Sequence, residues 1–188
     1  MKRRSSLRRH WFPIAIVAGF PIYALLHSDA TRSCGPLPGL IPTSVAADLP
    51  TAKTAAPSWE LTSVDGTKIS SDEFAGKTIV LNFWGTWCPP CREEIPALVE
   101  LQKEFADQNL QVIGIAIEND PSGLGTFVDR NEINYPIALG DDKVLEAYGA
   151  GQVFPTTFFI SPDGRIASYV EGALPYEAFE KVARALLK

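Results

Sequence analysis

The sequence predicts an α/β fold in which a mixed central sheet carries helices on both faces and an N-terminal β-hairpin. Two observations lead to this prediction. Two continuous apolar runs typical of buried strands, 78–83 and 110–117, flank a segment with helical periodicity. Near the C-terminus, Ser161-Pro162-Asp163-Gly164 is a hairpin turn between two further strands. Strands that alternate with helices pair in parallel through right-handed crossovers, whereas hairpins add antiparallel partners.

The elements of this domain are expected in a definite order. It begins near Ser58 with a hairpin around the Asp-Gly turn at Val64-Asp65-Gly66, and a serine at 70 or 71 then caps a short helical turn. Further strands are expected over 78–83, 110–117, 135–139, 157–160 and 165–170. Helices are expected over 92–108, 122–131, 143–148 and 176–187.

The chain before the domain is expected to be an export segment and a tether. Residues 1–30 join a basic start to an almost uncharged apolar run, 11–26, which is the pattern of an export signal. We expect an uncleaved single-pass anchor in the cell membrane, with the domain, 58–188, on the extracytoplasmic (periplasmic) side. Cleavage at Ser28-Asp29-Ala30, which releases a periplasmic protein, is the alternative. Residues 31–57 are rich in Pro, Ala, Ser and Thr, the composition of a flexible tether.

Charge divides the chain in a similar way. Residues 1–33 hold six of the 17 Lys and Arg residues and one of the 22 acidic residues, a net charge of +5, which leaves the rest of the chain at −10. A domain that acidic has no electrostatic footprint for nucleic acid. We therefore expect no nucleic-acid partner.

The chemistry of the sequence is concentrated in Cys88-Pro89-Pro90-Cys91, between the strand that ends at Phe83 and the helix that follows. The first cysteine is expected at the positive end of the helix, where unpaired backbone N–H groups and the helix dipole favour a thiolate. The second lies one turn further on the same face, close enough to attack the first sulfur in a mixed disulfide. The spacing therefore predicts a thiol–disulfide redox site.

Other uses of such a cysteine pair fit the sequence less well. A zinc site needs a second pair of Cys or His ligands, but both histidines, His10 and His27, lie in the export segment, so no metal or cofactor is expected. Haem attachment needs a histidine after the second cysteine, where this chain has Arg92. Peroxidases place Pro seven residues and Thr three residues before their reactive cysteine, and those positions here are Leu81 and Gly85.

Two motifs resemble the thioredoxin superfamily, and more closely its membrane-tethered extracytoplasmic ResA/TlpA-type branch. The first is Phe83-Trp84-Gly85-Thr86-Trp87-Cys88-Pro89-Pro90-Cys91, with Pro96 behind it. The second is Phe154-Pro155-Thr156-Thr157-Phe158, in the expected order along the chain. The resemblance covers residues 58–188. It implies a thioredoxin fold and oxidoreductase activity on protein disulfides.

The resemblance also implies roles for individual residues. Cys88 is expected to be the exposed nucleophile and Cys91 the buried resolving thiol, and the two form the redox disulfide. Pro155 is expected to be a cis proline facing the cysteines, an arrangement that leaves the backbone of Phe154 free to pair with a substrate strand. The residues expected to bind or support the substrate are Trp87, Pro89, Pro90, Phe154, Pro155 and Thr156.

One residue departs from the wider superfamily. Cytosolic thioredoxins carry a buried acid six residues before the first cysteine, where this chain has Asn82, which cannot relay a proton to Cys91. The related branch uses an acid after the next strand, a position that aligns with Asn119, one residue beyond Glu118. Glu118 is therefore a hypothesis for the proton partner of Cys91, and a solvated loop carboxylate is its alternative.

Pro89 and Pro90 bear on the direction of the redox reaction. Because proline has no N–H, these residues withdraw donors from a Cys88 thiolate, which favours a more reducing couple. The expected function is the reduction of disulfides in partner proteins such as apocytochrome c or a copper-site cysteine pair, with a membrane thiol–disulfide relay protein as electron donor. A general disulfide oxidase or isomerase and a redox-sensitive binding module without turnover remain alternatives.

Overall fold

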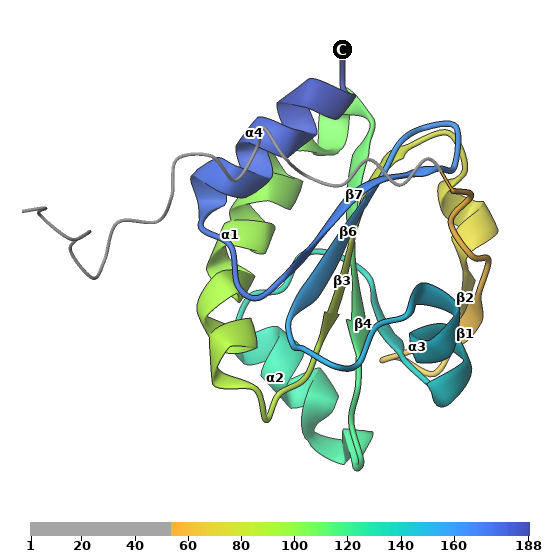
Figure 1. Cartoon of the computed structure of the whole chain (residues 1–188). Helices are drawn as coiled ribbons and strands as arrows, with labels where there is room; N and C mark the ends of the chain where they lie inside the picture. The colour runs from red at the N-terminus through yellow and green to blue at the C-terminus, as the bar shows by residue number, and fades with distance from the viewer. Residues whose placement is uncertain (1–53) are drawn as a thin grey trace, which may run out of the picture. The chain divides into compact units, whose positions relative to one another are not determined.

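The computed structural model describes residues 54–188. Its strands are β1 (Glu60–Ser63), β2 (Lys68–Ser70), β3 (Thr78–Trp84), β4 (Leu110–Ala116), β5 (Ile137–Leu139), β6 (Thr156–Ile160) and β7 (Ile166–Glu171). Its α-helices are α1 (Pro89–Phe105), α2 (Leu124–Arg130), α3 (Asp142–Tyr148) and α4 (Tyr176–Leu186), with 3-10 turns at Ser71–Phe74, Ala106–Gln108 and Pro121–Gly123. The strands form one seven-stranded sheet in the order β2-β1-β5-β4-β3-β6-β7 (Figure 1). The predicted α/β fold, with its mixed sheet and N-terminal hairpin, is confirmed.

Strand pairing brings two distant segments to the same edge of the sheet. The strand β3 pairs in parallel with β4 and antiparallel with β6. At the C-terminal end of β3, Trp84 lies opposite Ala116 on one side, and Phe83 lies opposite Thr156 on the other. The turn that follows β3 and the segment that precedes β6 therefore meet at this edge.

Each face of the sheet has its own apolar core. The first core packs α1, α2 and α4 against the sheet, and the second packs α3 and the N-terminal hairpin against the opposite face (Figure 1). In α1, the stripe predicted to face inward is buried throughout: Ile95, Leu98, Leu101 and Phe105. The sheet is therefore covered on both faces.

The helix α1 begins at Pro89, three residues before the predicted start at Arg92. Proline fits the first turn of a helix because the N–H groups there have no partner within the helix and its fixed φ is already helical. Cys88 is consequently the N-cap residue, and Pro96 lies inside the helix as expected.

Contacts between the domain and the preceding chain begin before the expected boundary at Ser58. Ala55 forms an antiparallel bridge with Arg165, and the Ile166 N–H donates to the carbonyl of Thr54 at 2.9 Å. The expected export segment, 1–30, lies outside the described residues. Within residues 54–188, none of the helices combines the length and apolar character that crossing a bilayer requires.

Candidate active site

The two cysteines form a disulfide at the start of α1. The bond between Cys88 Sγ and Cys91 Sγ is 2.10 Å long, and the two Cα atoms are 5.3 Å apart. Cys88 is fixed by the turn after β3, because its N–H donates to the carbonyl of Gly85 at 3.2 Å. Its Sγ also accepts the Cys91 N–H at 3.3 Å. The predicted juxtaposition of two sulfurs with the positive end of a helix is therefore present.

The two sulfurs differ in access to solvent, although less than expected. Cys91 has no exposed surface, whereas 4% of Cys88 is exposed. The expectation that Cys88 is openly exposed is wrong for this oxidised form. Its Sγ is bonded inward to Cys91, and both cysteines belong to the core between α1 and the sheet. Cys88 is still the more accessible of the two sulfurs.

Aromatic and proline residues lie around the disulfide. The Phe154–Pro155 peptide bond is cis, as predicted. The rings of Trp87 and Phe154 meet edge to face at 5.4 Å, and Trp87 is 54% exposed. Thr156 is buried, and its hydroxyl donates to the carbonyl of Val153 at 2.7 Å, which closes the turn before β6. We call the pair Trp87 and Phe154 the aromatic wall.

A buried carboxyl group lies one helical turn beyond Cys91. Glu94 is almost fully buried on the same face of α1, and its Oε1 accepts the Asn82 Nδ2–H at 2.7 Å. Its Oε2 accepts the Leu174 N–H at 3.1 Å. Burial raises the pKa of Glu94 to about 7, although both hydrogen bonds favour the ionised form. This carboxyl therefore changes its charge near neutral pH.

Two further polar groups complete this buried region. The Asn82 side chain also donates to the Thr157 hydroxyl at 3.0 Å, which links β3 to β6. Burial, and then the nearby charge of Glu94, raises the pKa of the Tyr135 hydroxyl. Glu94, Asn82 and Thr157 are therefore joined by hydrogen bonds inside an apolar core, and Tyr135 lies within range of the Glu94 charge. Among residues 54–188, His, Cys, Asp and Glu side chains form no group that could hold a metal ion.

This geometry agrees with what the chain resembles among known proteins. The model of the AhpC/TSA family matches residues 52–169, more than half of the chain. The chain belongs to the AhpC/TSA family. Within it, the chain is 33% identical over 120 residues to a thiol-disulfide oxidoreductase ResA from Bacillus subtilis (strain 168), covering 63% of this chain and 66% of that protein. It is 32% identical over 126 residues to the ResA protein of Bacillus thuringiensis (strain Al Hakam), covering 66% and 72%.

A solved structure extends the likeness to the fold. A thiol:disulfide interchange protein of the thioredoxin family from Chlorobium tepidum TLS is 30% identical, with a TM-score of 0.68, and covers 72% of this chain and 97% of that one. The fold is thus thioredoxin-like, as the sequence resemblance implied. The names of the relatives and the disulfide described above identify this AhpC/TSA-family protein as a thiol-disulfide oxidoreductase.

Glu118 occupies a different place from Glu94. Both of its oxygens accept hydrogen bonds from Thr86, in the turn that leads to Cys88. Its role as the proton partner of Cys91 stays a prediction. The residue that the sequence analysis missed is Glu94, although a signal was available. It falls on the inward stripe of α1, between Cys91 and Leu98, where a charged side chain is rarely found without a partner.

Proposed function

We propose that this protein is an exported, membrane-anchored oxidoreductase that reduces disulfides in partner proteins outside the cytoplasm. The observation that carries the proposal is the Cys88–Cys91 disulfide at the N-terminus of α1, next to the aromatic wall. The basic and apolar pattern of residues 1–30 supports export and anchoring.

The proposed reaction transfers two electrons to the substrate, whose two sulfurs leave as thiolates and take their protons from solvent. In the reduced protein, the Cys88 thiolate attacks one sulfur of a substrate disulfide, forming a mixed disulfide and releasing the first substrate thiolate. The Cys91 thiol loses its proton, and its thiolate attacks Cys88 Sγ. The second substrate thiolate leaves and the Cys88–Cys91 disulfide forms. Glu94, buried one turn away, is the carboxylate best placed to accept the proton of Cys91.

The two prolines at the N-terminus of α1 support a reducing role. Pro89 and Pro90 occupy the first two positions of α1, so neither supplies an N–H to Cys88. The Cys91 N–H is the backbone donor within reach of Cys88 Sγ. A thiolate with few donors is weakly stabilised, which makes the dithiol a stronger reductant.

The resemblance to the ResA/TlpA-type branch supports apocytochrome c, or a copper-site cysteine pair, as the substrate. Because stray thiols tend to be oxidised outside the cytoplasm, the dithiol needs an electron supply of its own. We propose a membrane thiol–disulfide relay protein as that donor.

The test is a Cys91→Ser variant of the full chain, expressed in cells. Without the resolving thiol, the mixed disulfide on Cys88 persists, so we expect a covalent, reductant-sensitive adduct with an exported cysteine-containing protein. The matched control, Cys88→Ser/Cys91→Ser, should capture nothing. Mass spectrometry then identifies the captured protein.

Two alternatives give different outcomes. A general oxidase would have a Cys88–Cys91 reduction potential close to those of strong oxidants, about −120 mV, in equilibrium with glutathione. A binding module would keep its partner affinity in Cys91→Ser and show no turnover in the unmodified chain. Either result would contradict the proposed reductase.

A further inference from the structure

The chain from the end of β3 to Trp87 is hydrogen-bonded at four points to Ile117 and Glu118, the two residues that follow β4. Glu118 Oε1 accepts the Thr86 N–H at 2.5 Å, and Glu118 Oε2 accepts the Thr86 hydroxyl at 3.0 Å. Next to them, Trp87 Nε1–H donates to the carbonyl of Ile117 at 2.8 Å. The Ile117 N–H in turn donates to the carbonyl of Trp84 at 2.8 Å. The segment Ile117–Glu118 therefore holds the whole turn between β3 and Cys88.

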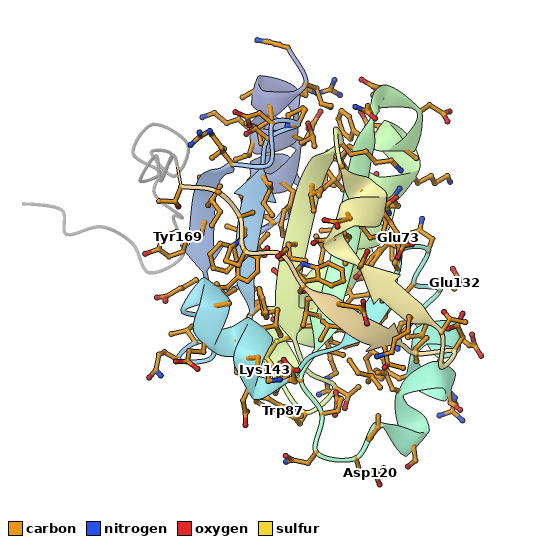
Figure 2. All side chains as sticks on the ribbon, turned by 90° about the vertical axis from the view of Figure 1, so that its right-hand side faces the viewer. Glu73, Trp87, Asp120, Glu132, Lys143 and Tyr169 are labelled. Carbon is orange, nitrogen blue, oxygen red and sulfur yellow. A yellow bond between two sulfur atoms is a disulfide. The ribbon has the colours of Figure 1, made fainter. Side chains whose placement is uncertain are left out.

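The same contacts fix the direction of Trp87. A Cβ atom on Gly85 would lie 2.5 Å from Trp87 Nε1 and 3.0 Å from the Ile117 carbonyl, so the indole closes over a site that only glycine leaves empty. The indole also meets the Phe154 ring, with an angle of 83° between the two ring planes. Trp87 is thus half-exposed but is held by one hydrogen bond and one ring contact. Figure 2 shows Trp87 at the same end of the domain as Asp120, which lies just beyond Glu118.

We propose that Glu118 is a positioning residue that holds Trp87 against Phe154 and so shapes the protein-binding side of the Cys88 disulfide. This inference rests on the proposed exchange reaction at Cys88. In this role Glu118 acts through hydrogen-bond acceptance by its two oxygens, and it transfers no proton. A protein disulfide needs the aromatic wall for docking, whereas a small disulfide reaches Cys88 without it.

The position of Glu118 favours this role over proton transfer to Cys91. Both of its carboxylate oxygens bind Thr86, which lies in the turn that precedes the helix, whereas Cys91 is buried within the first turn of α1. The carboxyl that shares the buried face of the helix with Cys91 is Glu94. In this proposal Glu118 positions the turn before Cys88, and Glu94 accepts the proton of Cys91.

Two substitutions at one position separate the two roles. In Glu118→Gln, the amide oxygen still accepts the Thr86 N–H, and the Thr86 hydroxyl can turn to accept from the amide. We expect this variant to retain activity on protein substrates. Glu118→Ala loses both acceptors, and we expect KM for a protein disulfide to rise about tenfold, as losing hydrogen bonds to a charged group suggests. The rate with hydroxyethyl disulfide, a small substrate, should stay unchanged in both variants.

Controls come from neighbouring residues. Asp120 lies two residues after Glu118, and its carboxylate accepts the Ser122 N–H. We expect no change in KM for the protein disulfide in Asp120→Ala. Thr86→Val removes only the hydroxyl, so its effect should lie between those of Glu118→Gln and Glu118→Ala. This variant also tests the proposal if Glu118→Ala folds poorly.

A second readout needs no turnover, so it separates failure of this inference from failure of the proposed function. The indole N–H resonance of Trp87, assigned by its loss in Trp87→Phe, reports the bond to Ile117 in the full chain. We expect protection from hydrogen exchange in the unmodified chain and Glu118→Gln, and faster exchange in Glu118→Ala. Equal loss of activity in Glu118→Gln and Glu118→Ala overturns the proposal in favour of proton transfer. An unchanged KM and unchanged indole exchange in Glu118→Ala also overturn it.

Discussion

Asn82 and Glu94 together replace a feature of cytosolic thioredoxins. Those proteins carry a buried acid on the strand, at the position of Asn82, whereas here the buried acid is Glu94 on the helix. Because the Asn82 amide donates to Glu94 and to Thr157, it stabilises the carboxylate without adding a second negative charge. In this chain the buried acid thus follows the cysteine pair in sequence, at Glu94, instead of preceding it at position 82. The domain still has an acid within one helical turn of Cys91.

The raised pKa of Glu94 predicts a pH dependence of stability in the oxidised protein. The unfolded chain releases this proton near pH 4.5, whereas the folded protein holds it up to about pH 7. The folded state therefore binds more protons between these values, and the free energy of unfolding falls as pH rises across them, by about 3 kcal/mol. Glu94→Gln should abolish this fall.

The measurement is chemical denaturation at pH 5 and pH 8. Glu93→Gln is the matched control, because Glu93 is adjacent in sequence and exposed, and its substitution should leave the pH dependence as it is. A fall of the same size in Glu94→Gln would contradict the assignment of the proton to this carboxyl.

Residues differ in how far the sequence predicts their roles. The cysteines were identified because two cysteines at that spacing have few other uses, whereas the role of Pro155 came from the resemblance to the thioredoxin superfamily. Glu94 was missed because helical periodicity was traced through apolar residues alone. Glu118 was named from its position after a strand, but which carboxyl is buried depends on side-chain packing from α1 and on the loop that carries Leu174. The sequence does not specify that packing.

At the level of elements, two glycines differ in whether their surroundings have room for a side chain. Gly114 lies in β4, where a Cβ atom would be 2.6 Å from Ile137 Cδ1 and 2.8 Å from Trp84 Nε1. Gly125 lies in α2, where a Cβ atom would meet nothing within 4 Å. The glycine in the strand allows Trp84 to pack against the sheet, whereas the glycine in the helix makes no such contact.

These two positions predict stability changes of opposite sign. Gly125→Ala should raise the free energy of unfolding by about 0.5–1 kcal/mol, because alanine favours the helix and restricts the unfolded chain. Gly114→Ala should lower it by about 1–3 kcal/mol, because the core must shift to admit a methyl group. Denaturant titration of both variants measures the difference. A stabilised Gly114→Ala would show that Trp84 and Ile137 move aside at no cost.

Element types were predicted well and their ends less well. The strand expected over 135–139 is β5, which begins at Ile137, and the helix expected over 122–131 divides into a 3-10 turn and α2. Periodicity identifies the middle of an element, whereas its ends depend on local hydrogen bonds. Asp120, for example, accepts the Ser122 N–H and so starts the 3-10 turn before α2.

For the whole molecule, the proposed anchor predicts where the protein is found. The full chain should remain with membranes after extraction at high pH, and protease added from outside the membrane should release the domain by cutting within residues 31–53. Intact mass analysis distinguishes an anchor from a cleaved signal, because cleavage would give a chain that begins at Thr31. Recovery of the uncleaved chain in the cytosolic fraction would contradict export.

The hydrogen bond from Leu174 to Glu94 has a consequence for the whole domain. Leu174 belongs to the loop between β7 and α4, and in the same loop the Gly172 N–H donates to the carbonyl of Pro155 at 2.7 Å. One short loop thus connects the acid behind the cysteines with the proline beside the substrate. The Leu174 N–H bonds a side-chain carboxylate, and this hydrogen bond is strongest when Glu94 is ionised. The buried acid and the cis proline are therefore anchored by the same short loop, so the position of one constrains the position of the other.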